Sequence, residues 1–292
     1  MLDLHIDQKP EVKTFFDEGS NTFSYVVSDP ATKSAAIIDA VMEFDTISGR
    51  LTYEQADEIL AYINAEGFTV EWIIETHVHA DHLSGAPYLQ EKLGGKIAIS
   101  EHIQTVQDTF GKIFNEGTEF QRDGSQFDKL FKDGDSYTIG TINAFAMHTP
   151  GHTPACMVHV IGDAVFVGDT LFMPDAGSAR ADFPGGDAST LYDSINRILA
   201  LPDEMRLFVC HDYGPNGRAL AYETTIGAQK EANIHVGSGA SKDDFVRMRE
   251  ERDAQLSLPK LILPSLQVNM RAGEVPTDDA GQMAIKIPVN KL

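Results

Sequence analysis

The sequence predicts a layered α/β fold, and two features of its hydrophobic pattern support this prediction. Helix and strand patterns alternate early in the chain, with a helix at 51–68, a strand at 69–74, a short helix at 86–94 and a strand at 96–100. Between residues 136 and 168, strand patterns instead follow one another closely. Helices that alternate with strands are typical of proteins in which layers of helices cover a β-sheet.

The helices are predicted from the spacing of their apolar residues and from the residues at their ends. In the helix at 51–68, three apolar residues recur at helical spacing, and a glycine suits the end (Ile59, Leu60, Ile63 and Gly67). The helix at 187–202 places four apolar residues on one face (Leu191, Ile195, Ile198 and Leu199). A charged helix at 241–256 begins with Ser241 and Asp244 at the spacing of a capping box.

The other strands are short apolar runs bounded by residues that favour turns. We expect them at 22–27, 34–39, 136–140, 142–149, 156–161, 164–168 and 206–210. The pair Gly162-Asp163 suits a tight hairpin turn between two of these strands. After about residue 215 the chain has more helix and loop character, so we expect residues 1–292 to form one domain with a helical C-terminal appendage.

Composition excludes several classes of partner. Hydrophobic residues make up 42% of the chain, which is enough for a sizeable core, while 23 basic and 44 acidic residues give a net charge of −21. A surface of this sign repels nucleic acid and anionic lipid. The two cysteines do not indicate a disulfide framework, and neither a signal peptide nor an apolar run of about 18 residues is present. We therefore expect a cytoplasmic protein without nucleic-acid or membrane partners.

Residues that commonly coordinate metals follow four of the predicted strands. Three imidazoles and a carboxylate fall within six positions after the strand at 69–74, and further ones follow three later strands (His77, His79, Asp81 and His82; His148 and His152; Asp169; His211 and Asp212). Ligands gather at the carboxyl ends of strands in layered α/β proteins. Nitrogen and oxygen donors of this kind suit zinc, iron or manganese.

Several other residues of the same chemical types are expected to have only structural roles. His5, His102, His148, His159 and His235 are expected to be hydrogen-bonded side chains without a role at the metal. Both cysteines lie in apolar strand patterns and are expected to be buried and inert. Alternation along the strand at 206–210 predicts that Cys210 points away from the pocket.

The order of these residues resembles the metallo-β-lactamase superfamily. The segment THVHADH matches its H-x-H-x-D-H signature, and His152 in TPGHT, Asp169 in GDT and His211 in CHDYG match the three later ligand positions. The resemblance covers residues from about 15 to 215. It implies a four-layer αββα sandwich, the metallo-β-lactamase fold, with a metal site at its edge.

Two activities within the superfamily fit this set of donors. A glyoxalase II-like hydrolase of glutathione thioesters holds two metals, and the resemblance would assign His77, His79 and His152 to one metal. Asp81, His82 and His211 would then bind the other, with Asp169 as a bridge and a bridging water as the nucleophile. Because every one of these residues is present, the donor count leaves this alternative open.

The flanking sequence resembles instead the persulfide dioxygenases, also called sulfur dioxygenases. The similar segments are LFMPDAGSARADFPGGDASTLYDSI, HDYGPNGR and the tail LPKLILPSLQVNMRAG with its N-M-R-x-G element, so the resemblance covers nearly the whole chain. It implies one Fe²⁺ per chain, held by His77, His152 and Asp169. The substrates would be O₂ and glutathione persulfide, or a similar low-molecular-weight persulfide, and the products sulfite and glutathione.

The same resemblance gives roles to residues around the iron. It implies that His79, Asp81, His82 and His211 orient ligands or waters. Zinc or a second metal remains open, and relatives of this kind can form homo-oligomers. No feature of the sequence favours a non-catalytic metal sensor.

Three residues are candidates for contact with the substrate. Arg180 matches an arginine that the family places near the iron, although it could instead form a structural bridge with Asp182. Tyr213 could donate a hydrogen bond to sulfur or oxygen, and Arg218 is either a carboxylate contact or a solvated side chain. Some members of the family carry a cysteine just before the matching arginine, whereas this loop reads DAGSAR.

Overall fold

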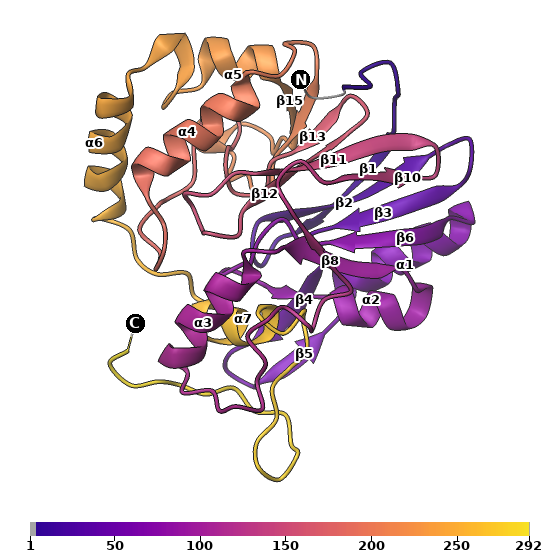
Figure 1. Cartoon of the computed structure of the whole chain (residues 1–292), viewed down its shortest axis with the longest axis vertical. Coiled ribbons are helices and arrows are strands. Elements are labelled where there is room, and N and C mark those ends of the chain that lie inside the picture. The colour runs from indigo at the N-terminus through magenta and orange to yellow at the C-terminus, as the bar shows by residue number, and fades with distance from the viewer. Residues whose placement is uncertain (1–3, 292) are drawn as a thin grey trace.

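Two six-stranded β-sheets form the centre of the fold, and helices cover the outer face of each (Figure 1). This computed structural model describes residues 4–291. Residues 1–3 and residue 292 lie outside the described residues. The first three belong to the N-terminal segment in which the sequence analysis predicted no signal peptide. The expected four-layer αββα sandwich is confirmed by this arrangement.

The first sheet combines an antiparallel edge with a parallel half. Its strands are β1 (Glu11–Asp17), β2 (Thr22–Asp29), β3 (Ser34–Ile38), β6 (Thr69–Ile74), β8 (Lys96–Ser100) and β9 (Lys129–Phe131). They lie in the order β1-β2-β3-β6-β8-β9. β2 is antiparallel to both β1 and β3, whereas β3, β6, β8 and β9 all run parallel.

The second sheet follows the chain order closely. Its strands are β10 (Ser136–Ile139), β11 (Ile142–His148), β12 (Met157–Ile161), β13 (Ala164–Phe166), β14 (Arg206–Phe208) and β15 (Glu223–Thr225). All of its pairs are antiparallel except β13 with β14. A small third sheet joins β5 (Arg50–Thr52), β4 (Val41–Asp45) and β7 (Leu83–Ser84) in that order.

The helices belong to two groups on opposite sides of the sheets (Figure 1). They are α1 (Glu54–Glu66), α2 (Ala86–Leu93), α3 (Ile103–Ile113), α4 (Ala188–Leu199), α5 (Ile226–Ala232), α6 (Lys242–Asp253) and α7 (Ile262–Asn269), with short 3₁₀ helices at Pro215–Gly217 and Gly237–Gly239. Apolar residues of α1, α2 and α3 pack on the first sheet, and those of α4 pack on the second.

Strand β3 is buried on both of its faces, between two separate cores. All five of its residues are buried, and their side chains alternate between two cores. Ala36 and Ile38 pack in the core between the two sheets. Ala35 and Ile37 pack instead under α1, α2 and α3. A strand that is buried on both faces carries a continuous apolar run, as "SAAII" does.

Most predicted elements are present, with differences at their ends. The helix predicted at 51–68 begins only at Glu54, because residues 50–52 pair with β4 as β5. It ends before Gly67, whose left-handed φ of 68° closes the last turn. Ser241 caps α6 by accepting a hydrogen bond from the backbone N–H of Asp244, so the predicted cap is confirmed. Several elements were not predicted individually, among them strands β1, β4 and β9 and helices α3, α5 and α7.

The strand directions bring the ends of five strands to one edge of the sandwich. In the first sheet, β3 and β6 run parallel and end side by side. In the second sheet, β11 and β13 are both antiparallel to β12, and β13 is parallel to β14, so these three strands also run in one direction. A hydrogen bond from the N–H of Phe23 to the carbonyl of Cys210 joins the two sheets at this edge.

The turn after β13 is tightly packed against the end of β6. Gly168 has a φ of 50°, and a Cβ there would lie 2.6 Å from Oγ1 and 2.8 Å from Cβ of Thr76. We expect Gly168→Ala to destabilise the fold by roughly 3–5 kcal/mol, because backbone strain adds to this clash. Gly67→Ala, at a φ of 68° with open space around it, is the matched control and should lose only about 1–2 kcal/mol. If urea unfolding showed equal losses of unfolding free energy for the two variants, the predicted clash would be contradicted.

Candidate metal centre

The residues predicted to coordinate a metal gather at the edge where the five strands end. His77, His79, Asp81 and His82 lie in the loop after β6, and His152 lies between β11 and β12. Asp169 follows β13, and His211 follows β14. Each is buried except Asp81, which is half-buried. The tertiary structure therefore brings together all seven side chains from four separate parts of the chain.

Two imidazoles and one carboxylate form the most compact group. Potential ligand atoms of His77, His152 and Asp169 all lie within 4.8 Å of one another. Nε2 of His77 is 3.8 Å and Nε2 of His152 is 3.6 Å from the same Asp169 oxygen, Oδ2. These three residues are the ones that the sequence predicts for a single iron, and their role as ligands stays a prediction.

A second group lies beside the first. Ligand atoms of His79, Asp81 and His82 also lie within 4.8 Å of one another. His211 connects the two groups, because its Nε2 is 3.4 Å from Oδ2 of Asp81 and 3.2 Å from Oδ1 of Asp169. The arrangement therefore offers donors for one metal or for two.

Several potential metal-ligand atoms in the site have no hydrogen-bond partner among the described residues. These buried atoms are Nε2 of His77, Nδ1 of His79 and Nε2 of His82. Burying a polar atom without a partner is costly, and a bound cation would satisfy these atoms together. The chemistry of the donors, imidazole nitrogen and carboxylate oxygen, fits a divalent transition metal.

The opposite ring nitrogens are held by the protein. Nδ1 of His152 donates to the carbonyl oxygen of Arg180 at 2.8 Å, and Nδ1 of His211 donates to that of Asn21 at 3.0 Å. Because a carbonyl can only accept, these contacts place a proton on Nδ1 and direct Nε2 towards the other candidate ligands. Nδ1 of His77 lies 3.0 Å from the hydroxyl of Thr76.

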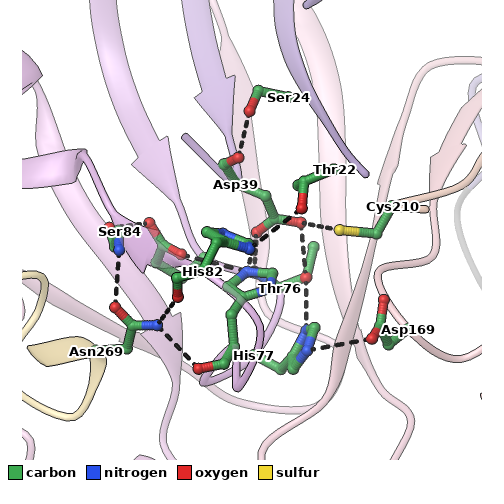
Figure 2. Close-up of polar contacts among 12 residues, drawn as sticks. Thr22, Ser24, Asp39, Thr76, His77, His82, Ser84, Asp169, Cys210 and Asn269 are labelled. Carbon is green, nitrogen blue, oxygen red and sulfur yellow. Dashed lines mark hydrogen bonds and ion pairs between the residues drawn. The ribbon is translucent and has the colours of Figure 1, made fainter. Parts of the chain in front are cut away.

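Asp39 is a central residue of the site that the sequence analysis missed. Its carboxylate lies 3.0 Å from Nε2 of His79. It also accepts hydrogen bonds from both the N–H and the hydroxyl of Thr76 at 2.8 Å (Figure 2). Burial opposes its ionisation, but the His79 imidazole outweighs this and lowers the pKa of Asp39 to about 2. Asp39 directly follows β3, so the strand-end position that marked the other residues could have identified it.

The position of Cys210 differs from the prediction. Strand β14 ends at Phe208, so strand alternation does not extend to Cys210. Its sulfur lies 3.7 Å from Oδ2 of Asp39 and within 4.8 Å of ligand atoms of Asp169 and His211, so the prediction that it points away from the pocket was wrong. Both cysteines are buried as expected, and burial raises the pKa of the Cys210 thiol, which keeps it protonated.

The arginines predicted to contact substrate are held by carboxylates. Arg180 donates from Nε and Nη2 to Asp182 at 2.6 and 2.7 Å, which is the structural bridge that the sequence left open. Arg218 is not a solvated side chain, because it binds Asp175 through two hydrogen bonds and Asp212 through two more. Contact of either arginine with a substrate stays a prediction.

A cleft of about 990 Å³ is lined in part by candidate metal-binding residues, among them His152, Asp169 and His211. Tyr213, 62% exposed, stands at this cleft with its ring stacked on that of His211. Three further cations line the cleft, Arg50, Arg252 and Lys260, and none of them forms an ion pair with a described residue. The sequence analysis did not identify these three, because nothing in their local sequence distinguishes them from other surface cations.

The remaining histidines that the structure places have protein partners. Nε2 of His148 donates to the carbonyl of Pro154, and His148 also stacks on His102. His159 lies 2.9 Å from the hydroxyl of Tyr137. His235 accepts a hydrogen bond from the N–H of Ser178. Within residues 4–291, no helix is both long and apolar enough to cross a membrane.

Metal binding is expected to release protons from this site. Burial lowers the pKa of His211, but Asp169 and Asp81 outweigh it and raise this pKa to about 9. The metal-free imidazolium would therefore be charged at pH 7, and a cation arriving beside it would expel the proton. Metal affinity should accordingly rise as the pH rises towards 9.

This expectation can be measured by titrating Zn²⁺ into weakly buffered protein that contains a pH indicator. His211→Gln should release fewer protons than the unaltered protein, whereas His148→Gln, outside the site, should release the same number. Equal release from His211→Gln and the unaltered protein would show that His211 is not the source.

Two relatives of nearly the same length are named as a probable metallo-hydrolase and a glyoxylase. It is 51% identical to a probable metallo-hydrolase of Burkholderia pseudomallei, over 96% of this chain and 99% of that protein. It is 47% identical to glyoxylase B2 of Dictyostelium discoideum, over 98% of this chain and 99% of that protein.

More distant relatives carry the name of a dioxygenase. The chain is 28% identical to the mitochondrial persulfide dioxygenase ETHE1 of Homo sapiens, over 91% of this chain and 90% of that protein. The crystal structure of ETHE1 from Myxococcus xanthus superposes with a TM-score of 0.71 at 30% identity, over 90% of this chain and 100% of that one.

The family itself follows from the match of residues 17–211 to the sequence pattern of the metallo-beta-lactamase superfamily. This range contains every candidate metal-binding residue, and the fold around it is the four-layer sandwich that the family resemblance implied. The chain belongs to the metallo-β-lactamase superfamily.

Proposed function

We propose that this protein is a mononuclear non-haem iron persulfide dioxygenase. The observation that carries the proposal is the compact group of His77, His152 and Asp169, two imidazoles and one carboxylate. Such a set suits Fe²⁺ and leaves other coordination positions for substrates. The proposal is also supported by the names of the more distant relatives and by the similarity to the Myxococcus structure.

The proposed reaction converts glutathione persulfide, O₂ and one water to glutathione and sulfurous acid, which ionises to sulfite. The sulfur–sulfur bond breaks, the terminal sulfur is oxidised, and O₂ is reduced. A bound ferrous ion would supply the redox chemistry that amino-acid side chains lack. The protein contributes oriented ligands, because His152 and His77 are each held through their second ring nitrogen.

Cations that have no ion-pair partner among the described residues line the cleft, and they support the proposal that the substrate is an anion. The chain carries a net charge of −21, which repels the carboxylates of glutathione persulfide. Local positive charge in the cleft would offset this repulsion. Arg50, Arg252 and Lys260 provide this charge without a competing carboxylate within ion-pair distance among the described residues. We therefore assign the substrate carboxylates to this group, while Tyr213 remains the proposed hydrogen-bond donor near the sulfur.

A dinuclear hydrolase of glutathione thioesters is the second candidate. It is favoured by the donor group of His79, Asp81 and His82, in which the buried Nε2 of His82 has no hydrogen-bond partner among the described residues. The name of the Dictyostelium relative points in the same direction. This candidate requires two metals per chain, so the number of bound metals separates the two functions.

We expect the purified protein to bind about one iron per chain and to consume O₂ with glutathione persulfide. Asp169→Ala should lose iron and O₂ consumption together, because it removes the only carboxylate of the compact group. Asp193→Ala, an exposed carboxylate on α4, is the matched control and should retain both. Elemental analysis and an oxygen electrode provide the measurements.

Two results would contradict the proposal. One is an iron-loaded protein that consumes no O₂ with the persulfide. The other is two metals per chain together with rapid cleavage of S-lactoylglutathione, which would establish the hydrolase instead.

The role of the cleft cations can be tested on helix α6. Arg252→Gln should raise KM for glutathione persulfide about 10-fold and leave kcat nearly unchanged, since a contact made equally in ground and transition states affects binding alone. Arg247→Gln is the control, because Arg247 lies on the same helix but pairs with Asp244 and does not line the cleft. An unchanged KM in Arg252→Gln would exclude this cation as a substrate contact.

A further inference from the structure

The loop that carries four of the candidate ligands, at residues 77–82, is held by one side chain from the C-terminal part of the chain. Asn269, the last residue of α7, donates from Nδ2 to the carbonyl oxygens of His79 at 2.9 Å and His82 at 2.8 Å. Its Oδ1 accepts a hydrogen bond from the N–H of Ser84 at 2.8 Å. Figure 2 shows the Asn269 amide facing Ser84 and the loop that contains His82.

The loop has little other backbone support. No hydrogen bond between two backbone groups of the described residues involves residues 77–82. The two carbonyls bound by Asn269 therefore have a side-chain partner in place of the ladder that a strand or helix would provide. Both amide hydrogens of Asn269 are used on this loop, so the contact fixes the backbone of His79 relative to that of His82.

Helix α7 is itself firmly docked at this position. Asn269 is only 4% exposed, and the neighbouring Val268 is fully buried against Met42 and Leu83. Beyond the helix, Gly273 has a φ of 92°, and a Cβ there would lie 2.9 Å from the carbonyl oxygen of Ser84. The amide of Asn269 thus has a fixed location from which it can define the geometry of the loop.

We propose that Asn269 is a positioning residue of the metal centre. It does not touch the candidate ligand atoms, but it sets the backbone from which the imidazoles of His79 and His82 project. The buried nitrogens of these rings, Nδ1 and Nε2 respectively, have no hydrogen-bond partner among the described residues and are the atoms whose direction depends on the loop. The inference requires that the site binds a divalent metal and that His79 and His82 act there, either as ligands or as groups that orient the ligands. It is independent of the reaction.

The test compares cobalt binding by variants at Asn269 with that of a variant at a buried amide outside the loop. Asn269→Ala removes all three contacts, and Asn269→Asp keeps the shape and the acceptor for Ser84 but loses the amide donor. Gln107→Ala is the matched control, because Gln107 is also a fully buried amide and donates to the carbonyl of the adjacent Met270 at 2.9 Å. It has no hydrogen bond to the loop at residues 77–84.

Co²⁺ affinity would be measured by visible absorption in competition with a chelator, and stability by thermal unfolding. We expect both Asn269 variants to bind Co²⁺ at least 10-fold more weakly than the unaltered protein, as is typical when a group that orients metal ligands is lost. Gln107→Ala should lower Tm but change the affinity less than 2-fold.

Two outcomes would overturn the inference. In one, Asn269→Asp binds Co²⁺ as tightly as the unaltered protein. In the other, Gln107→Ala loses as much affinity as Asn269→Ala at the same Tm, which would assign the effect to stability alone. Failure of the unaltered protein to bind Co²⁺ would instead contradict the metal centre itself.

Discussion

The face-to-face packing of the two sheets is the constraint on which the site depends. Apolar side chains such as Ile38 and Phe166 are removed from water in one common core between the sheets. Their packing fixes the relative position of the strands, and the strand directions then bring the ends of β3 and β6 beside those of β11, β13 and β14. No single sheet carries the full set of candidate ligands.

Bringing so many ionisable groups into one buried site is unfavourable unless they neutralise one another. Imidazoles and carboxylates alternate here, with His211 between Asp81 and Asp169 and with His79 between Asp39 and Glu75. Each carboxylate stabilises a neighbouring imidazolium, which lowers the cost of burial before any metal is present. Atoms that remain without a partner, such as Nε2 of His77, are the ones that a metal would satisfy.

The cations around the cleft differ in whether a carboxylate of the protein neutralises their charge. The guanidinium of Arg180 is committed to Asp182, while its backbone carbonyl orients His152. This residue therefore supports the metal centre through its main chain while its charge is neutralised. Arg252 and Lys260 lack such partners among the described residues, so their charge remains available to a ligand in the cleft.

The sequence by itself determined much of the fold and which residues are candidate metal ligands. Apolar periodicity predicted strands such as β6 and helices such as α4 to within a few residues. The spacing of His77, His79, Asp81 and His82 lies within one short segment, so it could be recognised without a structure. Strand ends at His152, Asp169 and His211 indicated the remaining members of the set.

Only the tertiary structure decided which distant groups meet. The hydrogen bonds from Asn269 span more than 180 residues of chain, and the contact between Cys210 and Asp39 spans 171. The bridge from Arg180 to Asp182 lies close in sequence, but whether it forms depends on how the loop is packed. Local spacing is fixed by covalent geometry and can be read along the chain, whereas contacts between separate segments depend on how the layers pack.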